Sequence, residues 1–416
     1  MSGRWQRAIG SLAVLGLLAL PACQSKPAAA LSLQVDRATA LIDQPLQITV
    51  SGVDAGAQAT VALSTVDRLG ARWSSSARFT ADSAGQIRVA AQAPTSGDYS
   101  GVQPMGLFSS LHADSSSALA FYLPPAPTQT AILTVTAGSA SADRSVIREL
   151  THTGLTVIDT RPEQEGFYGE YYSQRGMTSF LPSVIVLGGS EGGLYFSALT
   201  ARMLAAHGYP SLAVAYFQAP GLPSTLSNIP LEYFTRALAW IRQQPGVDSS
   251  HVLVYGISRG SEAALLLGAN FPEQVNGVIA LAPTDAATSA AWTLAGKPIP
   301  FTSQLNEPHP TDSPAALIPV ANVKGPVFMA CGGADRVWSS CPYARAIGAE
   351  LDAAHKGYPY TLLSYPQAGH GVGNLVPYTL AGRMGTLDGA SLLANDLARA
   401  KAWPRLLDFL SALRSP

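Results

Sequence analysis

The stretch from residue 251 to residue 268 constrains the fold of this chain more than any other. A β-branched, apolar run from Val252 to Tyr255 leads into Gly256-Ile257-Ser258-Arg259-Gly260, and an Ala/Leu-rich helical segment follows. A strand, a tight Gly-x-Ser-x-Gly turn and a helix in this order are typical of a nucleophile elbow, in which the glycines leave room for a strained serine. The pattern predicts Ser258 as a nucleophile. The alternative is an ordinary serine in a glycine-rich turn, since the chain has 38 glycines.

The segments that flank the elbow alternate between strand and helix patterns. Ser183 to Leu187 is a continuous apolar run, as in a strand buried on both faces. Such alternation produces a mainly parallel sheet with helices on both faces. We therefore expect residues 151–416 to form an α/β-hydrolase domain, with residues 154–176 linking the two halves of the chain through short strands such as 167–172. The patterns indicate further strands at 210–217, 277–281, 326–330 and 360–365, and helices at 194–207, 230–243, 344–355 and 395–413.

Residues 31–150 have a different pattern. Short apolar runs such as Leu46 to Val50 and Thr130 to Val135 alternate with period two, and Asp, Gly, Ser and Pro separate them. This pattern predicts an all-β, immunoglobulin-like sandwich. A chain of 416 residues has room for two such domains. No catalytic grouping stands out in the sandwich, so we expect it to pack against the site or to shape its edge.

A serine hydroxyl needs a base to remove its proton, and the base needs a carboxylate to orient it. In an α/β-hydrolase these follow the serine in the order acid, then histidine, at the carboxyl ends of strands. Of the seven histidines, His370 fits as the base, because it lies in a Gly-His-Gly loop just after the strand at 360–365. The others lie in or near the sandwich, at helix ends, before the elbow strand or in an irregular stretch: His112, His152, His207, His251, His309 and His355.

The acid has two candidate positions, each in a loop after a predicted strand. Asp335 follows the strand at 326–330, and Asp285 follows the strand at 277–281. Some α/β-hydrolases take the acid from the earlier strand, and either residue could instead cap a following helix. The residue pattern favours Asp335 and leaves Asp285 as the alternative.

Two backbone N–H groups are candidates for an oxyanion hole. The N–H of Arg259 lies at a helix N-terminus, where it can face a developing negative charge. The second donor is expected in the loop Gly188 to Gly193, at Ser190, because its glycines let backbone approach a ligand closely. A phosphate cradle is the alternative, but the loop has neither the spacing nor the lysine of such a motif.

The N-terminus has the features of an export signal. Arg4 and Arg7 precede an apolar segment, residues 8–20, that is too short to span a bilayer comfortably. Leu20-Pro21-Ala22-Cys23 resembles the bacterial lipoprotein cleavage box. We expect a signal peptide at 1–22, lipidation of Cys23 as a membrane anchor, and a linker at 23–30. Gln24 implies the periplasmic side of the outer membrane. The alternative is plain cleavage near Ala22.

Cys331 and Cys341 then remain as a possible disulfide, which an oxidising compartment would permit. A partly helical segment between them could instead hold them apart. Charged residues make up only 13% of the chain, about half of the usual ~25%, and the net charge is -1. Nucleic-acid binding needs clustered Lys and Arg, so it is not expected. No metal and no cofactor are expected either.

Several segments resemble one known family when they are taken together. Residues 256–260 match its elbow, where members carry Ser or Cys; residues 333–335 fit its acid loop; and residues 362–370 closely match the surroundings of its base. The family is that of the acyl-CoA thioesterases and the bile acid-CoA:amino acid N-acyltransferases, which joins a sandwich to an α/β-hydrolase. The resemblance implies Asp335 rather than Asp285 as the acid. Similar segments also occur at residues 101–107, 187–194 and 231–234.

The expected function is that of a serine hydrolase that cleaves an acyl thioester or ester through Ser258, Asp335 and His370. A serine at this position resembles the hydrolysing members of the family, whereas the export signal departs from members that act where CoA is abundant. The alternatives are acyl transfer to an amine or sugar in the cell envelope, and a non-catalytic binding protein on a hydrolase scaffold. The irregular stretch 283–322, with Trp292 and Phe301, is expected either to cover an acyl pocket or to form a surface loop.

Overall fold

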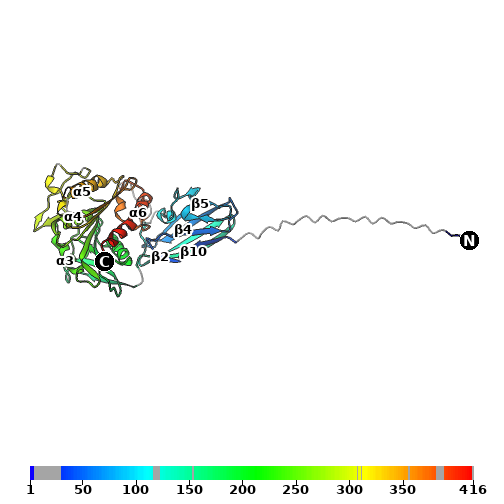
Figure 1. Ribbon diagram of the computed structural model, residues 1–416, viewed down its shortest axis with the longest axis horizontal. Coiled ribbons are helices and arrows are strands. Elements are labelled where there is room, and N and C mark those ends of the chain that lie inside the picture. The colour runs from blue at the N-terminus through cyan, green and yellow to red at the C-terminus, as the bar shows by residue number, and fades with distance from the viewer. Residues whose placement is uncertain are drawn as a thin grey trace.

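The structure is a computed structural model of the 416-residue chain. It describes residues 1–3, 30–115, 122–151, 154–306, 308–310, 312–354, 357–380 and 388–414. The expected signal peptide beyond residue 3, its lipidation site Cys23, and His152 and His355 lie outside these residues. No helix within the described ranges is long and apolar enough to cross a membrane. Two bodies lie side by side along the long axis of the molecule (Figure 1).

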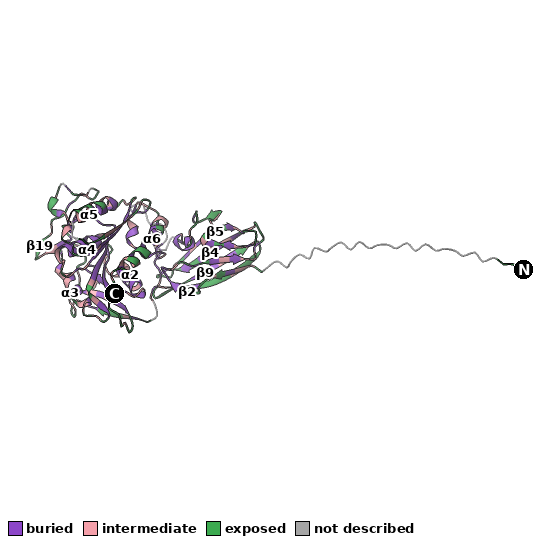
Figure 2. Cartoon of the chain, viewed as in Figure 1, coloured by how far each residue is buried: buried purple, intermediate pink, exposed green. Residues whose placement is uncertain are grey.

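The first body is a sandwich of two sheets. Val50 and Ile87 of one sheet and Val61, Phe79 and Leu133 of the other are fully buried in a single core. Burial alternates along the long strands, which confirms the period-two pattern (Figure 2). The immunoglobulin-like topology stays a prediction. One sheet holds β1 (Ser32–Val35), β3 (Ile48–Ser51) and β6 (Ile87–Arg88); the other holds β2 (Thr39–Leu41), β10 (Ala140–Glu149), β9 (Thr128–Ala137), β4 (Gln58–Val66), β5 (Arg72–Thr80) and β7 (Ser96–Gly97), with β8 (His112–Ala113) beside β5.

The second body is built on an eight-stranded sheet. Its six strands from β14 to β21 are parallel, whereas β11 and β12 are antiparallel at one edge. Residues 154–176, expected to link the two halves through short strands, form most of this edge of the sheet. In order, the strands are β11 (Leu155–Thr160), β12 (Tyr168–Gln174), β14 (Ser211–Ala215), β13 (Leu181–Leu187), β16 (Val247–Ile257), β17 (Val278–Leu281), β20 (Val327–Gly332) and β21 (Tyr360–Tyr365).

Helices cover both faces of this sheet, as expected. Along β13, Ile185 and Leu187 pack into the core beneath α3 (Glu232–Ile241), α4 (Arg259–Asn270) and α5 (Ser340–Ala354). Val184 and Val186 point to the opposite core, beneath α2 (Tyr195–Ala206) and α6 (Leu392–Ser411). A strand that is buried on both faces needs apolar residues at every position, which explains the continuous run at 183–187. Helix α6 lies on the side that faces the sandwich, against its short helix α1 (Gly106–Ser109) (Figure 1).

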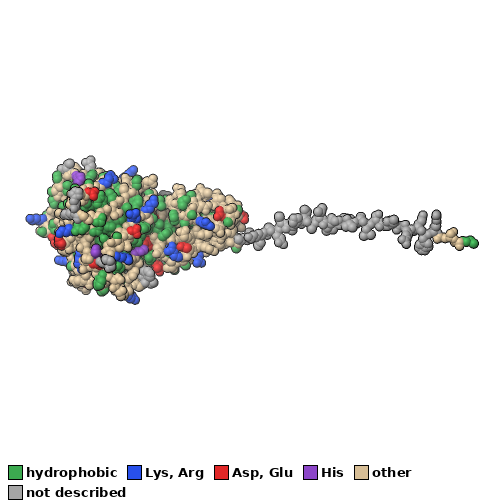
Figure 3. All heavy atoms as spheres, in the orientation of Figure 1, with side chains coloured by type: hydrophobic (Ala, Val, Ile, Leu, Met, Phe, Trp, Pro, Cys, Tyr) green, Lys and Arg blue, Asp and Glu red, His purple; other side chains and the backbone are tan. Residues whose placement is uncertain are grey.

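A small additional sheet fixes the irregular stretch after β17. It consists of β15 (Ile229–Pro230), β18 (Trp292–Leu294) and β19 (Lys297–Pro298). Trp292 is a core residue that packs on Tyr216 and Phe234, whereas Phe301 is 46% exposed. Trp292 therefore fixes this stretch to the body of the domain. Among the described residues, this domain has 3-10 turns at Pro314–Ala316, Val320–Asn322 and His370–Gly373, and the sandwich has one at Val89–Ala91. On the face in Figure 3, cations and anions are interspersed among neutral and hydrophobic side chains.

Candidate active site

Ser258 lies at the sharp turn between β16 and α4. Its φ is 54° and its ψ is -119°, a conformation that is strained for any residue with a side chain. The neighbouring glycines are required by space. An added Cβ would lie 1.9 Å from the carbonyl oxygen of Gly260 if it were at Gly256, and 2.2 Å from that of Gly188 if it were at Gly260. The local sequence therefore folds into the elbow that its pattern predicts.

The structure brings Ser258, His370 and Asp335 together from three separate loops. Nε2 of His370 lies 2.8 Å from Oγ of Ser258, and its Nδ1 lies 2.9 Å from Oδ2 of Asp335. The side chain of Asp335 is 1% exposed and that of His370 is 15% exposed, so the chain of hydrogen bonds runs from the interior to the surface. A base held in this way can accept the serine proton, and the carboxylate can stabilise the resulting imidazolium.

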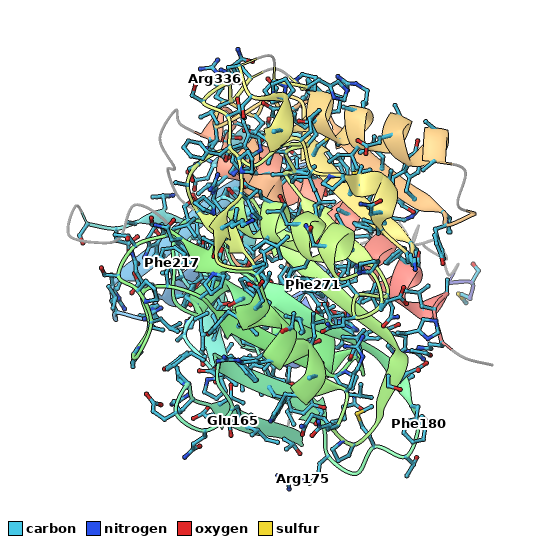
Figure 4. The ribbon with its side chains drawn as sticks, turned by 90° about the vertical axis from the view of Figure 1, so that its left-hand side faces the viewer. Glu165, Arg175, Phe180, Phe217, Phe271 and Arg336 are labelled. Atoms are coloured by element: carbon cyan, nitrogen blue, oxygen red, sulfur yellow. A yellow bond between two sulfur atoms is a disulfide. The ribbon has the colours of Figure 1, made fainter. Side chains whose placement is uncertain are left out.

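The loop after β20 fixes the carboxylate of Asp335. Its Oδ1 accepts hydrogen bonds from the backbone N–H groups of Val337 and Trp338, at 3.0 and 3.3 Å. The indole of Trp338 packs edge to face on the ring of His370, with 5.0 Å between the ring centroids. The side chain of Arg336, the residue after Asp335, lies at the outer edge of the molecule and is exposed (Figure 4). The loop therefore directs Asp335 inward and its neighbour outward.

Asp285, the alternative acid, has other partners. Its Oδ2 accepts a hydrogen bond from the backbone N–H of His309 at 3.0 Å and lies 3.6 Å from Nδ1 of that residue. Burial raises the pKa of Asp285, although the N–H and the imidazole of His309 oppose the shift. Of the two carboxylates, only Asp335 contacts the imidazole of His370.

The two candidate oxyanion donors come from the residue after Ser258 and from the Gly188–Gly193 loop, which lies close to Ser258. The N–H of Arg259 begins helix α4, and the first N–H groups of a helix lack acceptors within it. Across from it, a Cβ placed on Gly189 would lie 3.2 Å from Cβ of Ser258, so the Gly188–Gly193 loop covers the nucleophile closely. Ser190 is exposed in this loop. The hydroxyl of Tyr216 donates to the carbonyl oxygens of Gly188 and Gly189, at 2.6 and 3.2 Å, and thereby holds the loop in place.

Glu191 is a residue of the site that the sequence analysis missed. Its Oε1 accepts a hydrogen bond from the N–H of Gly189 at 3.0 Å, and its Oε2 borders the space beside Ser258 that a Gly189 side chain would fill. Although part of Glu191 is exposed, the removal of water from around its carboxylate raises its pKa. The N–H groups of Gly189 and of Glu191 itself, and nearby His370, oppose this shift. The available signal was that Glu191 is the sole acidic residue in the glycine-rich loop.

The Arg259 side chain forms a buried ion pair with Glu262. Its Nη1 lies 2.8 Å from Oε2 of Glu262, one turn further along α4. The Glu262 carboxylate is fully buried and also accepts hydrogen bonds from Nε1 of Trp292, at 2.6 Å, and from the hydroxyl of Thr288, at 2.9 Å. Burial raises the pKa of Glu262, and the attraction of Arg259 opposes this. The pair thus ties the elbow helix to the stretch that follows β17.

Cys331 and Cys341 form a disulfide. It joins the end of β20 to the first turn of α5 and closes the loop that carries Asp335. Within the ranges that the structure describes, no group of three or more His, Cys, Asp or Glu side chains could hold a metal ion.

A serine elbow on a mostly parallel sheet, with helices on both faces and a histidine and an aspartate at the same sheet edge, defines an α/β-hydrolase. Comparison with known families is more specific. Residues 43–161 match the acyl-CoA thioester hydrolase/BAAT N-terminal region, and residues 229–309 and 299–413 match the BAAT/acyl-CoA thioester hydrolase C-terminal region, where BAAT is the bile acid-CoA:amino acid N-acyltransferase. The chain belongs to this family, which confirms the resemblance in its motifs.

Individual relatives are distant but cover most of the chain. It is 27% identical to acyl-coenzyme A thioesterase 6 of Mus musculus over 347 residues, which are 79% of this chain and 82% of that protein. It is 26% identical to the bile acid-CoA:amino acid N-acyltransferase of the same species, over 89% and 95% of the two chains. Among solved structures, a putative dienelactone hydrolase from Klebsiella pneumoniae covers 62% of this chain and 98% of its own, with 17% identity and a TM-score of 0.45.

Proposed function

We propose that this protein is a serine hydrolase that cleaves acyl thioesters or esters through a covalent acyl-enzyme on Ser258. The observation that carries the proposal is the continuous chain of hydrogen bonds from Ser258 through His370 to Asp335. The family supports the acyl chemistry, because its members include proteins named acyl-coenzyme A thioesterases. A less strained turn would connect the strand and the helix better, so the strained backbone of Ser258 supports a functional role for this serine.

In the proposed reaction, Oγ of Ser258 attacks the acyl carbonyl carbon while Nε2 of His370 takes the serine proton. The negative charge that develops on the carbonyl oxygen is held by the N–H groups of Arg259 and Ser190. The intermediate collapses, the bond to the leaving group breaks, and the leaving sulfur or oxygen takes the proton from His370. Water, deprotonated by His370, then attacks the acyl carbon and releases the free acid and Ser258.

The location of the protein is part of the same proposal. The N-terminal segment supports an exported protein that is anchored in the bacterial cell envelope through lipidated Cys23. A thioesterase-like site in that compartment would act on acyl esters or thioesters that are present there, whichever leaving group they carry.

The test is a panel of acyl-CoAs of several chain lengths and p-nitrophenyl esters, assayed with the wild-type protein and with Ser258→Ala. The proposal expects free acid from at least one class of substrate, and a fall in kcat of roughly 10⁴-fold or more in Ser258→Ala. Activity that survives in Ser258→Ala overturns the mechanism.

A second arm separates hydrolysis from transfer. Amino acids, amines and sugars are added to the same reactions, and the products are examined by mass spectrometry. Free acid that forms at the same rate with and without these acceptors supports hydrolysis. An acylated acceptor that replaces the free acid would favour an acyltransferase instead.

A further inference from the structure

His370 begins a short 3-10 turn, and the two residues next to it cannot hold it by side-chain packing. The residues on either side of the histidine are Gly369 and Gly371, and neither has a side chain with which to pack. A Cβ would lie 2.0 Å from the carbonyl oxygen of Asp388 at the first position, and 2.7 Å from Nδ2 of Asn395 at the second, so a side chain at either position would displace its neighbours. Besides the hydrogen bonds of the turn itself, the groups that surround this loop therefore help to set the position of the imidazole.

Two buried side chains hold the loop from both sides of His370. The N–H of Gly369 donates to Oδ1 of Asn395 at 2.7 Å, and the N–H of Gly371 donates to Oδ1 of Asp388. The two side chains are joined to each other, since Nδ2 of Asn395 donates to Oδ2 of Asp388. Asn395 is 0% exposed and Asp388 is 2% exposed. We call Asp388 and Asn395 the base-loop clamp.

The clamp is anchored to parts of the protein that are themselves well fixed. Asn395 lies in the first turn of α6, which is capped by the side chain of Ser391. The next residue, Asp396, accepts a hydrogen bond from the hydroxyl of Ser109 in helix α1 of the sandwich. The loop of the catalytic base is thus connected through α6 to the N-terminal domain.

The same segment also touches the acid loop. A Cβ on Gly389 would lie 1.7 Å from the carbonyl oxygen of Ala334, the residue before Asp335. The backbone after Asp388 therefore packs directly on the loop that carries the acid. Burial raises the pKa of Asp388, and the N–H of Gly371, the amide of Asn395 and nearby His370 oppose the shift while Asp335 adds to it. Burying a carboxyl group is unfavourable, and Asp388 is buried where the loops that carry Asp335 and His370 meet.

We propose that Asp388 and Asn395 are positioning residues that hold the imidazole of His370 between Ser258 and Asp335. This inference rests on the proposed function, because it assigns a role only if His370 is the base. A displacement of about 1 Å at a reacting group can cost roughly 100-fold in rate, so the loss of either bond to the base loop should slow the attack by Ser258.

The clamp can be tested by exchanging its two residues. Asp388→Asn leaves an amide nitrogen facing the amide nitrogen of Asn395, and Asn395→Asp leaves two carboxylates facing each other. In the exchanged variant Asp388→Asn/Asn395→Asp all three hydrogen bonds can form again, but the bond between the two side chains is reversed. The amide at 388 accepts from the N–H of Gly371 and donates to the carboxylate at 395, and that carboxylate accepts from the N–H of Gly369.

The readout is the covalent labelling of Ser258 by a fluorophosphonate, which does not require the natural substrate. We expect each single variant to lower the first-order labelling rate constant by about 10- to 100-fold without a matching change in the reversible binding constant of the probe. The exchanged variant is expected to return to within a few-fold of wild type. Asn276→Ala is the matched control, because Oδ1 of Asn276 also accepts a backbone N–H, from Val252 in the middle of the elbow strand, besides a hydrogen bond from Arg242, and its labelling should not change.

The outcomes separate the two proposals. A wild-type protein that is not labelled overturns the proposed function itself. A labelled wild type with folded single variants that react at the wild-type rate overturns the clamp, and so does an exchanged variant that is folded but no faster than the single ones. Folding is followed by thermal unfolding. If Asn395→Asp does not fold, Asn395→Ala takes its place, since it removes the same bonds without bringing two carboxylates together.

Discussion

Nδ1 of His370 lies 2.9 Å from Oδ2 of Asp335, whereas the alternative acid, Asp285, lies against the backbone of His309. Both aspartates follow strands whose carboxyl ends meet at one edge of the sheet, and β17 and β20 are adjacent there. The choice between them is made by the loops. The Asp335 loop runs toward the base and is closed by the disulfide.

The first prediction concerns these two acids. Asp335→Asn keeps the size of the side chain but removes the charge that stabilises the imidazolium, and it favours the wrong tautomer of His370. We expect kcat to fall by about 10⁴-fold on whichever substrate the panel identifies. Asp285→Asn is the matched control and should keep kcat within a few-fold of wild type. A larger loss in Asp285→Asn than in Asp335→Asn would reverse the assignment.

Glu191 is expected to have two opposing effects on the reaction. Its carboxylate fixes the loop by accepting the N–H of Gly189, but a negative charge beside the oxyanion site opposes the charge of the transition state. Glu191→Gln keeps an acceptor and removes the charge, so kcat/KM at neutral pH should rise a few-fold. Glu191→Ala removes both and should lower kcat/KM. If Glu191→Gln and Glu191→Ala lowered kcat/KM by the same factor, the negative charge of Glu191 itself would be needed.

The buried carboxyl of Glu262 should make stability depend on pH. Because burial raises its pKa in the folded state above the ordinary value of 4.5, the folded protein binds more protons than the unfolded chain just above that pH. The contribution of Glu262 to the free energy of unfolding therefore falls as the pH rises through this interval. Glu262→Gln, which does not titrate, should match the Tm of wild type in acid and exceed it near neutrality.

The opposite result for Glu262→Gln has a clear meaning. If the variant is less stable than wild type by about 3–5 kcal/mol at neutral pH, the loss of the partner of Arg259 outweighs the cost of burying the charge. Thermal unfolding of the two proteins across the pH range distinguishes these cases.

The disulfide should support both stability and activity. On the chain-entropy model, a loop as short as that between Cys331 and Cys341 contributes roughly 2–3 kcal/mol to the free energy of unfolding. Reduction, or Cys331→Ala with Cys341→Ala, should therefore lower the Tm, and kcat should fall because the loop carries Asp335. The double variant is its own control, since a reductant should not affect it further. A fully reduced wild type with unchanged Tm and kcat would disprove both roles.

The proposed membrane anchor can be tested at Cys23. Cys23→Ser should abolish the incorporation of labelled palmitate and move the protein from the membrane to the soluble fraction of the cell envelope, because the lipid cannot be attached without the thiol. Purified Cys23→Ser protein should keep its hydrolytic activity. A variant that remains in the membrane fraction would contradict the anchor.

Much of the site could be predicted from local sequence because its requirements are local. The turn at Ser258 demands glycines at fixed positions, since a side chain at Gly256 or Gly260 would collide with backbone. Buried strands need unbroken apolar runs, which mark the parallel sheet and give the order of its loops. His370 could be predicted as the base because it lies in the loop after the last strand of the sheet.

Other features were decided only by the tertiary structure, because they depend on which distant loops meet. The residue pattern and the family resemblance favour Asp335, but chain order places Asp285 and Asp335 in equivalent loops, and it is the folded path of each loop that brings Asp335 rather than Asp285 to His370. Likewise, Asp388 and Asn395 carry no motif, and their role arises because α6 docks beside the base loop. Local sequence specifies backbone geometry through sterics within a few residues. The pairing of polar side chains across the molecule is set by the packing of whole elements, and no short stretch of sequence encodes it.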